Sequence, residues 1–139
     1  MKQKSDILII GAGPAGIVCA VTARKYYPQK DITVIRNISD SVIPCGIPYM
    51  FASLANPEDN KLGTAALDAN KVNVVEDNAV ALDRDNRTVK TENGNEYEYE
   101  RLVLATGSTP ITLPIPGIDK QGVYPIIKKM GYLKEVVSK

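Results

Sequence analysis

The stretch DILIIGAGPAG, residues 6–16, decides the fold of this chain. Its first part, Asp6 to Ile10, is a short and almost wholly apolar run, which is typical of a parallel strand buried on both faces. From Pro14 to Tyr27, small and apolar residues recur at helical spacing, which predicts a helix packed on a sheet. Asp31 to Arg36 (DITVIR) is β-branched and alternating, so it predicts a second strand. The chain therefore opens with a βαβ unit.

The turn between the first strand and the helix, GAGPAG, fits the pattern G-x-G-x-x-G. Gly11 permits a tight turn, Gly13 lets the backbone approach a pyrophosphate, and Gly16 allows close contact between helix and strand. Pro14 and Ala15 begin the helix, whose N-terminal amides face the negative charge of the ligand. The motif predicts a dinucleotide ligand, and the turn alone fits both FAD and NAD.

The end of the second strand leaves an alternative open. In a dinucleotide-binding unit an acidic residue about 20 residues after the turn accepts a hydrogen bond from the adenosine ribose. Arg36 occupies that position here. Since a guanidinium pairs well with a 2′-phosphate, Arg36 favours an NADP-dependent reductase, unless it is a solvated arginine at a strand end.

The rest of the chain predicts short elements joined by turns. Helices are expected from Pro48 to about Leu54, over Pro57 to Asn70, and from Lys128 to the end. Further strands are expected at 72–75 and 102–105, and an antiparallel meander at 79–83, 88–91 and 96–100. Four prolines between Pro110 and Pro125 predict an extended connector.

Cys45 lies between two prolines in VIPCGIPY, residues 42–49. A helix that starts near Pro48 would place exposed backbone amides near the sulfur, where they stabilise a thiolate. Gly46 removes side-chain bulk beside the sulfur, so that a flat ring or a disulfide would approach it closely. A buried structural cysteine is the alternative. Cys19 falls on the packed face of the first helix and is predicted to be a core residue.

Composition excludes several classes of function. Seventeen basic and sixteen acidic residues give a formal net charge of +1, so neither nucleic acid nor an anionic membrane is an expected partner. The chain has two distant cysteines and no histidine, and we expect no metal site. Its apolar N-terminal run, Ile7 to Ile10, is too short for a signal sequence or a membrane span, so we expect a cytoplasmic protein.

Three motifs, GAGPAG, PCGIPY and LVLATGSTPITLPIPGI, together resemble the one-cysteine group of FAD-dependent pyridine nucleotide-disulfide oxidoreductases. That group contains coenzyme A disulfide reductases, NADH oxidases and persulfide reductases. The resemblance runs along nearly the whole chain. It implies that the glycine turn holds the FAD pyrophosphate and that Cys45 is the single redox cysteine beside the flavin ring. It also implies that FAD is contacted by Ala105, Thr106 and Gly107 and by the backbone of Val80.

Basic residues at two places in the chain compare differently with the pattern of the family. Arg36 stands where the family commonly has a glutamate, which is a departure from its pattern. Arg24 and Lys25 resemble residues that meet the coenzyme A nucleotide in the reductases, although a solvated helix face is the simpler interpretation.

The resemblance implies an electron path. In that family a nicotinamide cofactor passes hydride to FAD, and electrons then reach the cysteine sulfur, which alternates between a thiolate and a mixed disulfide or sulfenic acid. No second cysteine lies close to Cys45, so a one-cysteine mechanism is implied. We expect an FAD enzyme with NAD(P)H as co-substrate and a small-molecule disulfide, persulfide or oxygen as acceptor. A non-catalytic nucleotide-binding fragment is the remaining alternative.

The expected fold class is α/β, a Rossmann-like FAD-binding domain with a parallel sheet and an inserted antiparallel β-meander. We assign residues 1–110 to this domain and residues 111–139 to a connector and helix that lead towards an NAD(P)H-binding domain. Family members continue into that second domain, a return segment and a dimerisation domain. We therefore expect the chain to be part of a longer homodimeric enzyme and to be inactive with NADH in isolation.

Overall fold

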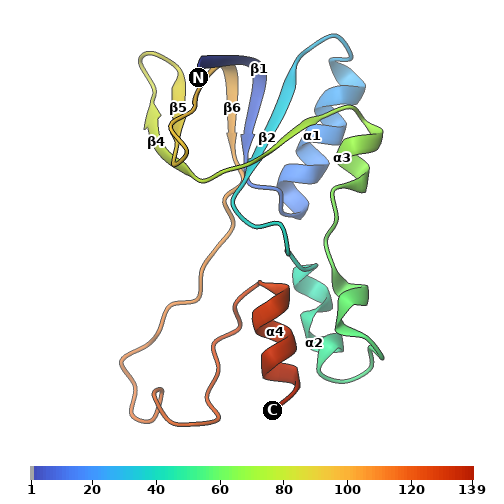
Figure 1. Cartoon of the computed structure of the whole chain (residues 1–139), viewed down its shortest axis with the longest axis vertical. Helices are drawn as coiled ribbons and strands as arrows, with labels where there is room; N and C mark the ends of the chain where they lie inside the picture. Colours follow the sequence, from blue (N-terminus) through green and yellow to red (C-terminus); the bar gives the residue numbers. More distant parts are fainter. Residues whose placement is uncertain (1) are drawn as a thin grey trace. The chain divides into compact units, whose positions relative to one another are not determined.

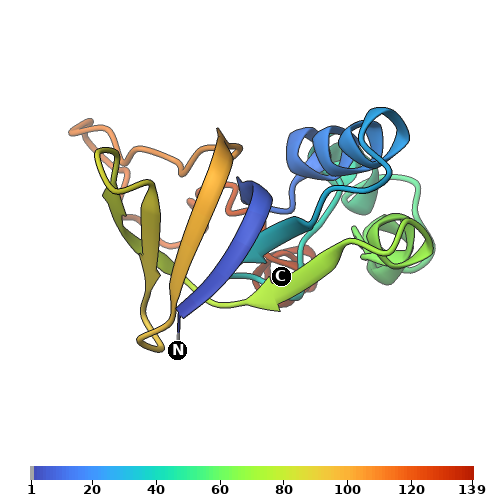
Figure 2. The same ribbon diagram turned by 90° about the horizontal axis from the view of Figure 1, so that it is seen from above.

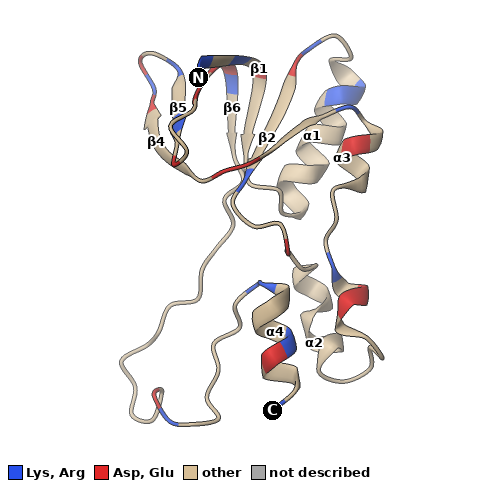
Figure 3. Cartoon of the chain, viewed as in Figure 1, with Lys and Arg blue, Asp and Glu red and all other residues tan. Residues whose placement is uncertain are grey.

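The computed structural model describes residues 2–139, which form two compact units (Figure 1). Unit 1 comprises the chain up to Ser39 together with Gly63–Gly107, and unit 2 comprises Asp40–Leu62 together with Ser108–Lys139. Basic and acidic residues are interspersed in both units (Figure 3). Within the described residues, no helix has both the length and the apolar character that crossing a membrane requires.

Unit 1 is built on a six-stranded sheet of order β3-β2-β1-β6-β5-β4 (Figure 2). Its parallel part consists of β1 (Lys2–Ile10), β2 (Ile32–Arg36), β3 (Asn73–Glu76) and β6 (Glu96–Leu104). The antiparallel strands β4 (Ala79–Asp83) and β5 (Thr88–Thr91) extend the sheet beyond β6. The predicted Rossmann-like fold, with a parallel sheet and an antiparallel meander, is confirmed.

Alternation along β1 divides the core of unit 1 between the two faces of the sheet. Ile9 packs with Ala20 of α1 (Pro14–Tyr26) and Leu67 of α3 (Ala65–Ala69), so both helices cover the same face. Leu8 and Ile10 join a second cluster on the other face, which also contains Ile35, Val89 and Tyr97. The β1 residues are therefore buried on both sides, as the apolar run predicted.

The largest difference from the predicted elements concerns β6. Residues 96–100 and 102–105 were predicted as two strands, but β6 is one strand that pairs with β1 from Lys2↔Glu96 to Ile10↔Leu104. The same register extends β1 back to Lys2, whose side chain also meets Glu98 at 2.6 Å across the strands. Cross-strand charge pairs support polar strand ends that hydrophobic patterning misses.

Two predicted helices are shorter than expected. The helix over 57–70 is divided into η2 (Pro57–Asn60) and α3, with Gly63 between them. The helix from Pro48 to Leu54 is replaced by η1 (Pro44–Gly46) and the four-residue α2 (Ile47–Met50). Its continuation closes as a turn, since the amides of both residues 53 and 54 donate to the carbonyl of Tyr49.

Unit 2 has its own small core. Val42, Ile47 and Met50 pack against Met130 and Leu133 of α4 (Met130–Val137), which confirms a helix at the end of the chain. The backbone amide of Met130 donates to the carbonyl of Asp40 at 3.0 Å, and Lys134 pairs with Glu58 at 2.7 Å. Residues 40–62 therefore fold with the C-terminal segment. These units are defined by packing, and the assignment of residues 1–110 to FAD binding stays a prediction.

Candidate dinucleotide-binding site

The carboxyl ends of the parallel strands meet at one edge of the sheet in unit 1. Ile10 lies opposite both Ile35 and Leu104, and Arg36 lies opposite Glu76. The chain runs from β1 outward to β2 and β3, whereas β6 lies on the other side of β1. The edge between β1 and β6 is therefore the topological switch point, where open α/β sheets bind their ligands.

Gly11 and Gly16 are fixed by close backbone approach. Gly11 has φ +108°, and a Cβ there would overlap the carbonyl of Ala105. Its amide donates to the carbonyl of Ile35 at 2.8 Å. Gly16 is buried, and a Cβ there would overlap the carbonyl of Gly11. Only glycine fits this tight junction between strand and helix.

Gly13 differs from the other two glycines because the space around it is open. It has ordinary dihedral angles (φ −75°, ψ −178°), and a Cβ there would meet no described heavy atom within 4 Å. It caps α1, which begins at Pro14 and has no acidic residue in its first turn. Among residues 2–139 no side-chain hydrogen bond caps this helix at Gly13. A helix N-terminus without a side-chain cap is suited to binding phosphate.

The end of β6 completes the turn. The amide of Ala105 donates to the carbonyl of Ile10 at 2.8 Å, and the Ala105 Cβ lies beside Gly16. Thr106 and Gly107 follow as exposed residues, and Gly107 has φ +72°. The structure thus brings the two motifs named from the sequence, the glycine turn and the Ala105–Gly107 strand end, to one place.

Arg36 is neither solvated nor available to a ligand in the way that the NADP alternative requires. Its side chain is only 14% exposed and forms an ion pair with Glu76, its register partner on β3. Its Nε is buried without a hydrogen-bond partner in the described chain. A polar pocket surrounds this pair, lined by Arg36, Asn37, Ser39, Glu76, Asp77, Asn78, Glu92 and Asn93.

Asp77 is a buried carboxylate in that pocket which sequence reasoning missed. The Thr91 hydroxyl and the backbone amides of Asn78 and Asn93 hold the pKa of Asp77 below its ordinary value of 3.8. The Asn78 amide donates at 2.8 Å, and the Asn95 side chain approaches at 3.4 Å. The Asn93-Gly94 turn carried a signal for the hairpin, but nothing in it pointed to Asp77.

Arg24 has a structural role that neither sequence interpretation included. Its Nε donates to the carbonyl of Asn70 at 3.0 Å, and its other nitrogens donate to the carbonyls of Pro28, Lys30 and Lys71 at 2.8–3.0 Å. Arg24 thus joins the end of α1 to the loops before β2 and β3, and the interpretation as a solvated residue is wrong. Lys25 is exposed.

Cys45 lies in unit 2, in the turn η1, and its side chain is exposed. The helix that follows has only four residues, so the expected help from a helix dipole is largely absent. The space beside Gly46 is also not open, because a Cβ there would overlap the side chain of Asn60. Asn60 is buried and donates to the carbonyl of Ile43 at 3.0 Å and to the sulfur of Met50 at 3.2 Å. Asn60 therefore holds the turn that carries the cysteine.

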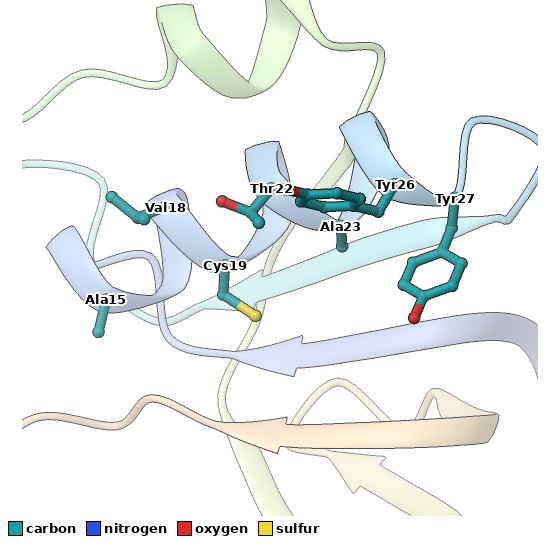
Figure 4. Close-up of a pocket in the computed structure, with 7 residues that line it drawn as sticks. All are labelled: Ala15, Val18, Cys19, Thr22, Ala23, Tyr26 and Tyr27. Atoms are coloured by element: carbon teal, nitrogen blue, oxygen red, sulfur yellow. The ribbon is translucent and has the colours of Figure 1, made fainter.

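Two further predicted residues lie in unit 1. Val80 is exposed and sits at a register shift in β4, between Ala79 and Ala81. Cys19 is half-buried and packs against the core cluster under α1, in agreement with its predicted core role. Cys19 also lines a pocket beside α1, whose lining residues are labelled in Figure 4, and its sulfur points towards the strands in that view.

Residues 5–136 match the family described as pyridine nucleotide-disulphide oxidoreductase. The chain belongs to this family. The resemblance drawn from the sequence motifs is thereby confirmed, and the family is one of oxidoreductases.

The relatives match this chain over only part of their own length. The NADH oxidase of Methanocaldococcus jannaschii is 35% identical over 133 residues, covering 86% of this chain and 29% of that protein. The NAD(P)H coenzyme A polysulfide/persulfide reductase of Pyrococcus horikoshii is 32% identical over 128 residues, covering 88% of this chain and 29% of that protein. This chain thus spans about 29% of the length of these relatives.

Two solved oxidoreductase structures have the same fold. The water-forming NADH oxidase from Lactobacillus brevis superposes with a TM-score of 0.74 at 26% identity, covering 94% of this chain and 32% of that chain. The NAD-dependent persulfide reductase from A. fulgidus has a TM-score of 0.78 at 24% identity, covering 99% and 27%. The second similarity supports the fold alone.

Proposed function

We propose that this chain is the FAD-binding part of an oxidoreductase that takes electrons from NAD(P)H through FAD to Cys45 and on to a disulfide, a persulfide or oxygen. Family membership and the names of two relatives, an NADH oxidase and a coenzyme A polysulfide/persulfide reductase, support this proposal. Cys45 is exposed, as a cysteine that reacts with a substrate must be.

The observation that carries the proposal is the open N-terminus of α1 beside Gly13. Gly11 and Gly16 have no room for a Cβ, whereas the space over Gly13 is empty. These residues fit a diphosphate bridge, which Gly13, Ala15 and Gly16 would hold through backbone amides. Ala105, Thr106 and Gly107 would contact the same ligand from the end of β6.

The chemistry divides between cofactor and protein. FAD, when bound, supplies two-electron transfer between a nicotinamide and sulfur or oxygen. The Cys45 thiolate would attack a disulfide, forming a new S–S bond and releasing one thiolate. Two electrons from NAD(P)H and one proton would then cleave that bond and return the Cys45 thiolate. Asn60, held by Ile43 and Met50, keeps the turn around Cys45 in place for this reaction.

Identification of the small molecule carried by the protein tests the proposal. Freshly purified protein would be denatured, and the released ligand would be analysed by mass spectrometry and flavin fluorescence. We expect FAD, either retained from the cell or bound after incubation with it. Release of NADP, together with failure to bind FAD, would favour the NADP-dependent reductase and overturn the proposal.

A further inference from the structure

The ion pair between Arg36 and Glu76 lies where a dinucleotide-binding unit recognises its adenosine ribose. An acidic side chain normally ends the second strand and accepts a hydrogen bond from the ribose. Here β2 ends in Arg36, and the carboxylate belongs to its register partner, Glu76 at the end of β3. Neighbouring strands are about 4.8 Å apart, so a glutamate side chain from β3 reaches the region that an acidic residue on β2 would serve.

The two side chains are unequally exposed, and this decides which of them meets a ligand. The Arg36 side chain is 14% exposed, whereas the Glu76 side chain is 60% exposed. Arg36 donates to Oε1 of Glu76, which leaves Oε2 with acceptor capacity for a hydroxyl. The backbone on either side is fixed, since the Asp77 amide donates to the Arg36 carbonyl at 2.9 Å. Arg36 is therefore the support, and Glu76 is the group presented to solvent.

The surrounding pocket suits a ligand with hydroxyl groups and disfavours one with a phosphate. Three carboxylates, on Glu76, Asp77 and Glu92, line it against the single guanidinium of Arg36. Asp77 is occupied by hydrogen bonds from the amides of Asn78 and Asn93, so Glu76 is the better-placed acceptor. The excess of negative charge in the pocket repels a 2′-phosphate. The Arg36 guanidinium, which would bind such a phosphate, is already paired with Glu76.

We propose that Glu76 is the ribose-binding carboxylate of the adenosine site, and that its pairing with Arg36 excludes nucleotides with a 2′-phosphate. This inference rests on the proposed function. Arg36 is a positioning residue in this scheme. It also is a latent phosphate site, because loss of the Glu76 charge would leave a guanidinium facing the pocket. The pair thus selects FAD, which has a 2′-hydroxyl, over NADP.

Binding measurements on the full chain test this inference without enzymatic turnover. The probes are FAD, 5′-ADP and 2′,5′-ADP, titrated into wild type and Glu76→Gln by calorimetry or by competition against FAD. We expect Glu76→Gln to bind FAD about tenfold more weakly, since one charge-assisted hydrogen bond is lost. We also expect its preference to move from 5′-ADP towards 2′,5′-ADP by about tenfold or more.

Two control variants separate this role from general charge and from folding. Glu92→Gln removes a carboxylate from the same pocket without touching Arg36, so it should leave the FAD affinity almost unchanged. The double variant Arg36→Gln/Glu76→Gln removes the pair without leaving a buried charge, so it keeps the fold if Glu76→Gln does not. It should lose FAD affinity and gain none for 2′,5′-ADP.

The outcomes are distinct. If folded Glu76→Gln and the double variant both bind FAD as wild type does, with the same order of preference for the two ADP probes, the pair only joins two strands and the inference is wrong. Preference of wild type for 2′,5′-ADP would also overturn it. If wild type binds neither FAD nor 5′-ADP, the proposed function itself fails.

Discussion

Gly13 in the glycine turn and Gly46 beside the cysteine both sit at the start of a helix, but their surroundings differ. A Cβ on Gly13 would meet nothing within 4 Å, whereas one on Gly46 would overlap the buried side chain of Asn60. The first glycine faces open space, and the second makes room for packing. The same residue type therefore lies beside open space in one unit, where we propose that the diphosphate binds, and beside a packed side chain in the other.

The largest loss of stability is expected at Gly11, where a side chain has no room. Gly11→Ala would force a Cβ into the Ala105 carbonyl at φ +108°, and we expect destabilisation of about 3 kcal/mol or more. Gly13→Ala is the matched control, with an expected cost of about 1 kcal/mol or less because its dihedral angles are ordinary. Thermal unfolding followed by circular dichroism measures both. Equal stability of the two variants would contradict the close packing described for Gly11.

A double-mutant cycle sharpens the account of the clamp at Gly46. Gly46→Ala should destabilise the protein by about 2 kcal/mol, because Asn60 must move and lose its hydrogen bonds to Ile43 and Met50. In an Asn60→Ala background the same substitution should cost much less, since the space is then empty. Additive effects of the two substitutions in denaturant unfolding would show that Asn60 does not fill that space.

The smallest effect is expected at Asp77, where it is present at neutral pH and disappears in acid. Its pKa is held below 3.8 in the folded protein, so its ionised form contributes stability at neutral pH that is lost as the pH falls through the folded pKa. Asp77→Asn should therefore lower the melting temperature at pH 7 and reduce its further fall below pH 3.8. Asp119→Asn, in the exposed connector, is the control. A wild-type acid profile in Asp77→Asn would contradict this assignment.

Local pattern was sufficient to predict the part of unit 1 that forms the turn. The apolar run before Gly11, the helix from Pro14 and the strand ending at Arg36 are all readable within a few residues. The glycine pattern also predicted that Gly11 and Gly16 are tightly packed, since the motif specifies both position and residue type. The hairpin signal at Asn93-Gly94 correctly located the meander.

Features that depend on partners distant in sequence were missed. The pairing of Arg36 with Glu76 needs the register of β2 with β3, and Arg24 reaches carbonyls near residue 70. Gly46 was interpreted as open space because Asn60, which fills it, is 14 residues further along the chain. Side-chain hydrogen bonds across such separations leave no periodic signal in the sequence.

The most direct test of the central claim compares FAD binding by wild type, Gly13→Asp and Gly13→Asn. Both side chains cap helices well, so both variants should unfold at or above the wild-type temperature. Only aspartate places a negative charge where the diphosphate would lie, and we expect it to weaken FAD binding about a hundredfold or more, with a smaller loss for asparagine. If all three folded proteins bind FAD with the same affinity, the helix N-terminus beside Gly13 does not hold the diphosphate and the proposed site is wrong.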